Sequence, residues 1–135
     1  MIPGAGAAGG LGFGLMAFCR GLLLPGFDMV ARLTNFAEKL KTCDLVITGE
    51  GRYDEQTFQG KTVEGIRQMA IREGKPMLVI AGTASSALKS KPPRGILQMI
   101  TLYDHSPSTE EIRHNSKNHL RQASQKLAQL LNEKY

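Results

Sequence analysis

Three short, continuously apolar segments restrict the possible folds of this chain more than any other feature. They cover residues 43–48, 76–81 and 95–103. Apolar runs of this length, without a polar residue at every second position, are typical of parallel strands with helices on both faces. We therefore predict an α/β fold with three layers and a mostly parallel sheet, although three strands make a thin one.

Helical patterns surround these segments and give the expected order ααβαββα. The predicted helices span residues 8–20, 29–41, 62–73 and about 109–133. Asp28 is the expected N-cap of the second helix, and Gly74 ends the third. Residues 84–95 are expected to form a loop or a short helix.

The composition indicates one soluble domain. The chain has 135 residues, of which 41% are hydrophobic and 21% charged, and no apolar run reaches the roughly 18–20 residues that a membrane span requires. Its two cysteines do not form a disulfide framework, so we expect reduced thiols and a cytoplasmic protein without membrane contacts.

The net charge of +5 raises the question of an anionic partner. The basic residues are scattered, and their one cluster, residues 89–94, has no aromatic side chains between them. Nucleic-acid readers usually combine a basic stripe with stacking aromatics, so we expect no nucleic-acid partner. No HExxH, CxxC or GxSxG pattern occurs, which argues against a zinc site and against a serine hydrolase.

Residues 48–61 follow the first apolar segment and are predicted to form the loop at the carboxyl end of a strand. That edge of an open α/β sheet is where ligands bind. Glu50 and Asp54 could hold a divalent metal or act as a general base, while Arg52 and Lys61 could neutralise phosphate oxygens. The alternative is a solvated turn that contains an Asp–Arg pair and a capping threonine.

Two further segments are rich in small residues. Residues 4–10 (GAGAAGG) precede a predicted helix, where unpaired backbone N–H groups can bind an anion, or where glycines can let two helices pack closely. Residues 81–86 follow the second predicted strand and would let a ligand approach the backbone. A plain strand-to-helix turn explains them equally well.

Two stretches together resemble the type I glycerate kinase family. They are residues 3–12 (PGAGAAGGLG) and 44–61 (DLVITGEGRYDEQTFQGK), supported by Pro25-Gly26 and residues 76–82. The resemblance implies a two-domain α/β kinase with its active site between the domains. ATP and Mg²⁺ would be the cosubstrate and its metal, and the γ-phosphoryl group would pass to D-glycerate to give phosphoglycerate.

The matching positions suggest roles for individual residues. Catalytic roles fall to Asp54, Lys61 and Arg52, and the metal would be held by Glu50. Substrate or phosphate would contact residues of both motifs: Gly4, Gly6, Ala7, Ala8, Gly9, Gln56 and Thr57.

The chain departs from the family in its length, because it corresponds only to the carboxyl-terminal third of a member. We interpret residues 1–135 as the carboxyl-terminal portion of a glycerate kinase-like domain, a partial domain of the two-domain fold. Alone it is expected to be incomplete and inactive. The alternative is a non-catalytic remnant that binds an anion or oligomerises, with another copy or the missing amino-terminal portion covering its open surface.

Overall fold

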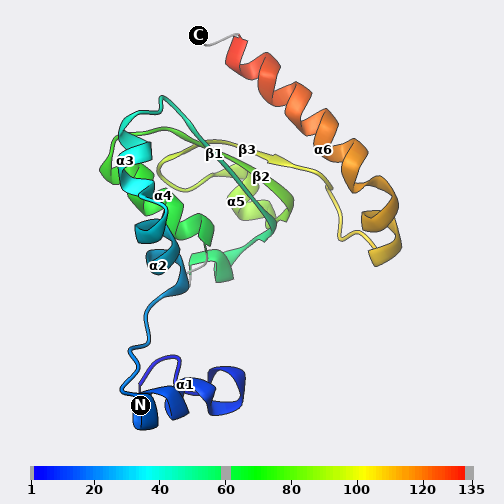
Figure 1. The fold of residues 1–135 in the computed structure, drawn as a ribbon. Coiled ribbons are helices and arrows are strands. Elements are labelled where there is room, and N and C mark those ends of the chain that lie inside the picture. The colour runs from blue at the N-terminus through cyan, green and yellow to red at the C-terminus, as the bar shows by residue number, and fades with distance from the viewer. Residues whose placement is uncertain (1, 59–61, 133–135) are drawn as a thin grey trace.

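The computed structural model describes residues 2–58 and 62–132 and shows a small parallel sheet with helices on both faces (Figure 1). In chain order the elements are α1 (Ala7–Cys19), α2 (Gly26–Leu33), α3 (Phe36–Lys41), β1 (Val46–Tyr53), the 3₁₀ helix η1 (Glu55–Phe58), α4 (Thr62–Arg72), β2 (Met77–Ala84), α5 (Ser86–Ser90), β3 (Ile96–Thr101) and α6 (Thr109–Asn132). The predicted α/β class is confirmed.

All three strands of the sheet run parallel, in the order β1-β2-β3. Val46 lies opposite Met77, and Met77 lies opposite Ile96. The three predicted strands therefore exist and pair as expected.

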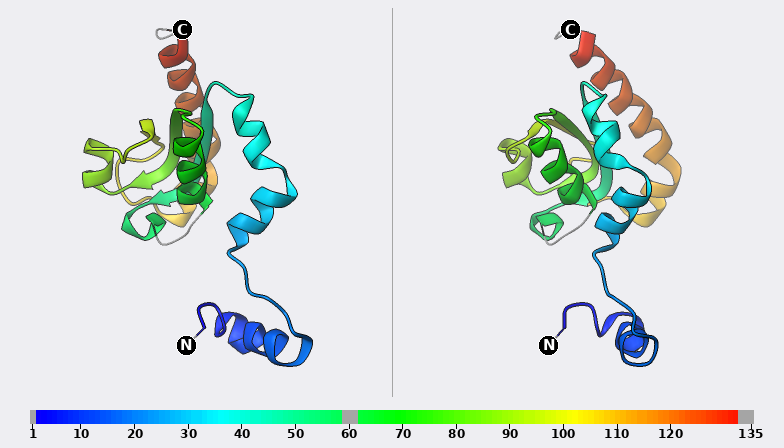
Figure 2. Two further views of the ribbon diagram at one scale, coloured as in Figure 1. Left: turned by 90° about the vertical axis from the view of Figure 1, so that its left-hand side faces the viewer. Right: turned by 60° about the vertical axis from the view of Figure 1, so that its left-hand side comes forward.

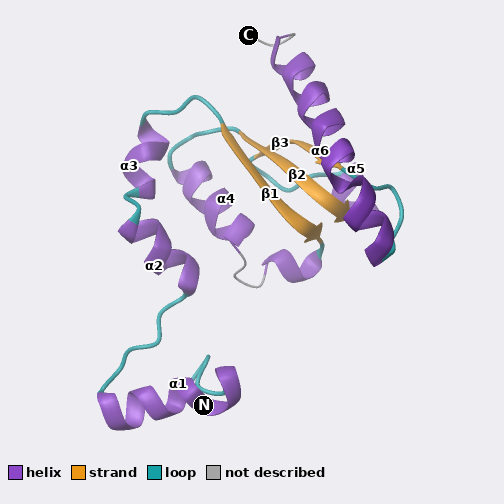
Figure 3. Ribbon diagram, turned by 45° about the vertical axis from the view of Figure 1, so that its right-hand side comes forward, coloured by secondary structure: helices purple, strands orange, loops and turns teal. Residues whose placement is uncertain are grey.

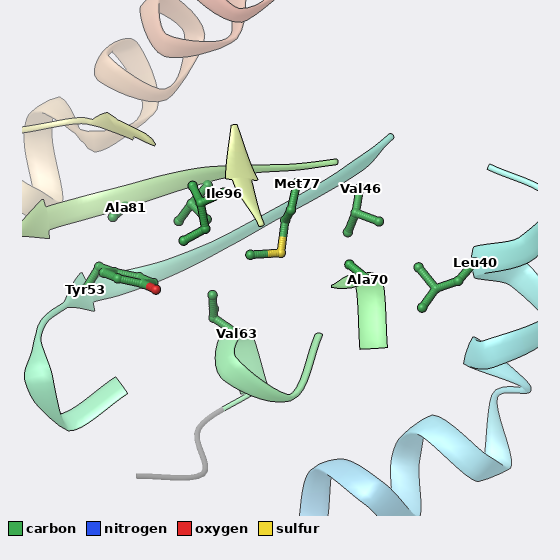
Figure 4. Close-up of a cluster of buried hydrophobic side chains, with 9 residues drawn as sticks. Leu40, Val46, Tyr53, Val63, Ala70, Met77, Ala81 and Ile96 are labelled. Atoms are coloured by element: carbon green, nitrogen blue, oxygen red, sulfur yellow. The ribbon is translucent and has the colours of Figure 1, made fainter. Parts of the chain in front are cut away.

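Two separate apolar clusters give the molecule its three layers. On one face, α3 and α4 pack on the sheet around Leu40, Val63 and Ala70 (Figure 4). On the other face, Ala123 and Leu127 of α6 pack on the strands. Figure 2 shows α6 and α4 on opposite sides of the sheet. The three-layer prediction is confirmed, although Ile47 of β1 is 51% exposed because α6 packs along β2 and β3.

Tyr53 ends β1 with a phenol that is fully buried and has no hydrogen-bond partner among the described residues. Burial raises the pKa of Tyr53 from its ordinary value of 10.0 to about 12. The folded state thus favours the neutral phenol. Its contribution to stability is complete below pH 10 and is lost as the pH rises toward 12.

We expect Tyr53→Phe to keep or increase stability at neutral pH, because the substitution removes a buried hydroxyl that lacks a partner. Above pH 10 the variant should lose less stability than the parent, by roughly 1.4 kcal/mol for each unit of pKa shift. Urea unfolding of both proteins at several pH values measures this difference. Parallel alkaline profiles would contradict the assignment.

Helix α1 lies apart from the sheet in every view (Figures 1 and 2). The chain enters it through a left-handed segment, with φ of 52° at Ala8, 68° at Gly9 and 92° at Gly10. Many of its apolar side chains face outward, and Phe18 is 87% exposed. The predicted helix is present, but residues 8–10 have left-handed rather than helical backbone angles.

The predicted helix over residues 29–41 is wrong in one respect, because the chain forms two helices there. Asn35 adopts a left-handed conformation at φ 51°, and α3 begins at the next residue. Asparagine is one of the few residues with a side chain that tolerates this conformation. Asp28 lies inside the first turn of α2 rather than at its N-cap.

The first strand is displaced along the chain from its predicted position, because it begins at Val46 rather than Cys43. It continues through residues 49–53, where backbone pairing joins Glu50 to Ala81 and Arg52 to Thr83. The first half of the predicted loop is therefore strand. Ladder hydrogen bonds come from the backbone, so a polar sequence at the end of a strand does not prevent pairing.

The remaining elements agree well with the sequence. Gly74 has the left-handed conformation that ends a helix, at φ 64°. The Ser108 hydroxyl accepts a hydrogen bond from the backbone N–H of Glu111 at 3.1 Å and so caps α6. No helix in the described part of the chain combines the length and the apolar character needed to cross a bilayer.

Candidate functional site

The chemistry-bearing side chains gather at the carboxyl edge of the sheet, as predicted. In Figure 3 the arrowheads of β1 and β2 point to the same edge, where η1 follows β1. Glu50 and Arg52 lie on the last residues of β1, and Asp54 follows that strand directly. The parallel register places Thr83 of β2 beside Arg52.

Thr57 connects two carboxylate-bearing residues of this edge, Glu50 and Asp54. Its hydroxyl donates to Glu50 Oε1 and accepts from the backbone N–H of Asp54, both at 3.2 Å. Thr57 is fully buried, and its own N–H donates to the carbonyl oxygen of Asp54 at 2.9 Å. These bonds fix the turn after β1 and the Glu50 side chain together. Direct contact of Thr57 with phosphate stays a prediction.

Asp54 holds the cation of the cluster. Its Oδ2 lies 2.9 Å from Arg52 Nε, and its Oδ1 accepts from the backbone N–H of Gln56 at 3.0 Å. The Asp54 side chain is 13% exposed, whereas that of Arg52 is 74% exposed. An ion pair this open to solvent contributes about 0–1 kcal/mol, so Arg52 can leave Asp54 at little cost.

Two adjoining pockets open on the same edge. The first, which we call the polar basin, has a volume of about 360 Å³ and is lined by Arg52, Thr83, Ala84, Ser85, Ser86, Lys89, Ser90, Tyr103, Asp104, His105 and Ser106. The second, which we call the apolar slot, has a volume of about 520 Å³ and is lined by Glu50, Gly51, Arg52, Gly82, Thr83, Leu102, Tyr103, Ser106, Pro107, Ile112 and Ser116. Four residues line both, which makes the two pockets neighbours: Arg52, Thr83, Tyr103 and Ser106.

Charged pairs border the polar basin. Lys89 Nζ forms an ion pair with Asp104 Oδ1, and this hydrogen bond lowers the pKa of Asp104. His105 Nε2 lies 3.1 Å from both oxygens of Glu111. Arg52 and Lys89 thus bring two cationic side chains to a single pocket.

The wall between the pockets is aromatic and largely buried. The ring of Tyr103 packs against His119 with centroids 4.7 Å apart, and its hydroxyl is buried without a hydrogen-bond partner among the described residues. Such a hydroxyl costs about 1–3 kcal/mol when it is left unsatisfied. Tyr103 is therefore a candidate donor to a ligand.

Glycine is required where the apolar slot crosses from β1 to β2. A Cβ atom on Gly82 would lie 2.3 Å from the carbonyl oxygen of Gly51, a contact with backbone that no rotamer change can relieve. At Gly51 an added Cβ would meet no atom within 4 Å. The two strands therefore approach each other closely, and Gly51 itself opens on free space.

The structure does not bring together every residue of the predicted site. Gly4, Gly6, Ala7, Ala8 and Gly9 lie on the separate α1 segment, away from the sheet (Figures 1 and 2). Lys61 lies outside the described residues. The roles of these residues stay predictions.

Several residues of the edge were missed by the sequence reasoning. Lys89, Tyr103 and Asp104 become neighbours only through the register of β2 with β3 and the path of α5. The small-residue run at 81–86 was the one available signal. Its Thr83, Ser85 and Ser86 line the polar basin.

The carboxylates of this edge suit a magnesium ion that arrives with phosphates better than a fully protein-held metal. In residues 2–58 and 62–132, no three His, Cys, Asp or Glu side chains converge as a metal site. Magnesium typically takes one or two carboxylates and completes its shell with phosphate oxygens and water. Glu50, fixed by Thr57 at the end of β1, fits that pattern.

Comparisons with known proteins find similarity to one family. The model of the glycerate kinase family matches residues 1–132. The chain is 42% identical over 127 residues to a glycerate kinase of Halalkalibacterium halodurans, covering 94% of this chain and 33% of the relative. It is 46% identical over 82 residues to glycerate 2-kinase of Escherichia coli K12, covering 61% of this chain and 22% of the relative.

A solved structure shows the same fold. A crystal structure from Salmonella typhimurium LT2 assigned to glycerate kinase 2 matches with a TM-score of 0.67 and 34% identity. The match covers 97% of this chain and 33% of that one. The chain thus spans about a third or less of the length of these relatives.

Proposed function

Because the chain belongs to the glycerate kinase family, we propose that it carries part of an active site that transfers the γ-phosphoryl group of Mg-ATP to D-glycerate. The observation that carries this proposal is the cluster at the end of β1. There Thr57 joins Glu50 to the backbone of Asp54, and Asp54 holds Arg52. The cluster offers a carboxylate and a releasable cation side by side, which phosphoryl transfer requires.

In the proposed reaction, Asp54 accepts the proton of a glycerate hydroxyl. The hydroxyl oxygen forms a bond to the γ-phosphorus, the bond from that phosphorus to the β–γ bridging oxygen breaks, and ADP leaves. Arg52 moves from Asp54 to the phosphoryl oxygens, where its charge stabilises the transition state. Its high exposure makes this movement inexpensive.

Glu50 would hold the magnesium ion, which when bound neutralises charge on the phosphate oxygens. The hydrogen bond from Thr57 fixes the direction of the Glu50 carboxylate before the ion arrives. Gln56 and Lys61 complete the proposed set, as contacts for phosphate or glycerate.

A graft tests the proposed function directly. Residues 1–132 would replace the matching third of the Halalkalibacterium halodurans glycerate kinase, with which this chain is 42% identical. We expect the graft to release ADP when glycerate and Mg-ATP are supplied. The chain of 135 residues alone should show little or no turnover in the same coupled assay.

The two halves of this test fail differently. A folded graft without turnover would overturn the proposed function. If the isolated chain turned over at a rate near that of a complete enzyme, only the expectation that it is inactive alone would be overturned. Circular dichroism and thermal unfolding of the graft identify a failure to fold.

A second candidate function is assembly, favoured by the outward apolar side chains of the amino-terminal helices. Phe18 of α1 is 87% exposed, Leu22 after it is also 87% exposed, and Leu33 of α2 is 75% exposed. Exposed apolar surface of this kind marks interaction sites in soluble proteins. Sedimentation that finds only a monomer at high concentration would argue against self-assembly.

A further inference from the structure

We propose that the carboxyl edge of the sheet binds the nucleotide, with the purine in the apolar slot and the phosphates in the polar basin. This inference rests on the proposed kinase function. It goes beyond that function because it assigns this third of the fold to the nucleotide and names where each part of the nucleotide lies.

The two adjoining pockets differ in chemistry, since one has apolar walls and the other a polar and cationic lining. The apolar slot has Leu102, Pro107 and Ile112 in its walls. The polar basin has Arg52, Lys89 and four serines in its lining. A nucleoside triphosphate has the same division, since a flat heteroaromatic ring is joined to a chain of anions.

The apolar slot suits a purine ring better than glycerate in both volume and chemistry. The volume of the apolar slot, about 520 Å³, lies within the roughly 300–1,000 Å³ of ordinary ligand pockets. Glycerate has three carbons that carry a carboxylate and two hydroxyls, so it has no apolar surface to place there. A purine ring does.

Two glycines, Gly51 and Gly82, line the apolar slot where it lies against the strands. Gly51 and Gly82 leave the strands bare at this point, and an added Cβ on Gly51 would point into open space. A planar ring can therefore lie close to the backbone of β1 and β2. Ser106 and Ser116 supply hydroxyl groups that can bond to the edge of the ring or to a sugar.

The two cationic side chains of the polar basin, Lys89 and Arg52, can turn to a polyphosphate. Lys89 and Asp104 are 44% and 84% exposed, so their ion pair is weak and a polyphosphate can compete for Lys89. Arg52, whose side chain is 74% exposed, lines both pockets and forms an ion pair with Asp54. The negative charge of Asp104 near the phosphates would be offset by the magnesium ion that a nucleotide brings.

Tyr103 lines both pockets and so lies at their junction. Its buried hydroxyl has no partner among the described residues. A ribose hydroxyl or phosphate oxygen at the junction of the two pockets would supply one.

Separate probes for each half of the nucleotide test this arrangement on the complete 135-residue chain. Adenosine, inorganic tripolyphosphate with magnesium, Mg-ATP and glycerate would each be titrated into ¹⁵N-labelled protein. We expect adenosine to shift the amide signals of Gly51, Gly82 and Ser116. Tripolyphosphate should shift those of Ser85, Ser86 and Lys89, and Mg-ATP should shift both groups.

Matched variants separate the two pockets. Ile112→Glu places a charge in the apolar slot and should weaken adenosine and Mg-ATP binding about tenfold or more, with tripolyphosphate binding retained. Leu120→Glu is the control, because Leu120 is similarly exposed on α6 and lies outside both pockets. Lys89→Ala should weaken tripolyphosphate and Mg-ATP about tenfold, with Lys91→Ala as its control.

A third variant protects the test against unfolding. Gly51→Leu fills open space rather than a packed contact, so it should fold and still exclude adenosine. The inference is overturned if Mg-ATP shifts neither pocket, if adenosine shifts only residues elsewhere, or if glycerate rather than adenosine occupies the apolar slot. These outcomes are independent of turnover by the graft, which decides the proposed function separately.

Discussion

Replacing Arg67 with Ala is expected to lower the free energy of unfolding by about 3–5 kcal/mol. Arg67 is 9% exposed and forms a two-pronged ion pair with Glu64, from Nε to Oε2 and from Nη2 to Oε1, each at 2.7 Å. Its Nη1 also donates to the carbonyl oxygen of Arg94 at 2.6 Å. The substitution leaves a half-buried carboxylate and a carbonyl group without their partner.

The pKa of Glu64 supports this expectation. Burial alone would raise the pKa of this carboxyl group, but the hydrogen bonds from Arg67 and Gln68 outweigh burial and lower it. A carboxyl group with a lowered pKa stabilises the fold above its unfolded pKa, and that contribution is lost as the pH falls. As the pH is lowered from neutral, the free energy of unfolding should therefore fall less in Arg67→Ala than in the parent.

Urea unfolding measures the effect of Arg67→Ala. Arg72→Ala is the control, because Arg72 lies exposed in the last turn of the same helix. Replacing Glu64 and Arg67 together with apolar residues should recover much of the loss, since no charge is then left unpaired. A change below about 1 kcal/mol in Arg67→Ala would show that the pair contributes no more than a surface contact.

Asp54→Asn in the grafted enzyme is expected to lower kcat by about 10²–10⁴-fold, the range for loss of a general base. Asparagine keeps the shape of the side chain, and its amide oxygen can still accept from the N–H of Gln56. What it loses is the charge that holds Arg52 and the ability to take a proton. The loss should therefore appear in kcat more than in KM.

Steady-state ADP release at several pH values checks this role of Asp54. Asp44→Asn is the matched control, because Asp44 is exposed and precedes β1 at the opposite end of the strand. Turnover within tenfold of the parent graft would exclude Asp54 as the base.

The sheet and its layers were predictable because they depend on long-period patterns. Largely apolar runs at residues 43–48 and 76–81 have few alternatives to buried parallel strands, and the structure has a strand at each, Val46–Tyr53 and Met77–Ala84. The cap at Ser108 was predictable because a hydroxyl before acidic residues satisfies the first N–H groups of a helix.

Features that depend on one residue or on register were not predictable. The break at Asn35 needs a single left-handed residue in an otherwise helical pattern. The extension of β1 to Tyr53 depends on backbone pairing with β2, which polar side chains do not reveal. Lys89 and Asp104 meet only because α5 and the end of β3 return to the same edge, so the polar basin has no local signature.

The strand order of the sheet has a consequence for where a complete crevice forms. Each connection steps to the adjacent strand in the same direction, from β1 to β2 to β3, with no reversal. In open α/β sheets the ligand crevice forms at the topological switch point, where the direction of strand order reverses. A further strand that paired outside β1 and began a second run of strands winding away from β2 would create such a reversal beside β1, with Glu50 and Asp54 at its rim. Within these three strands, the residues proposed for phosphoryl transfer thus lie on or directly after β1, the strand at which the winding begins.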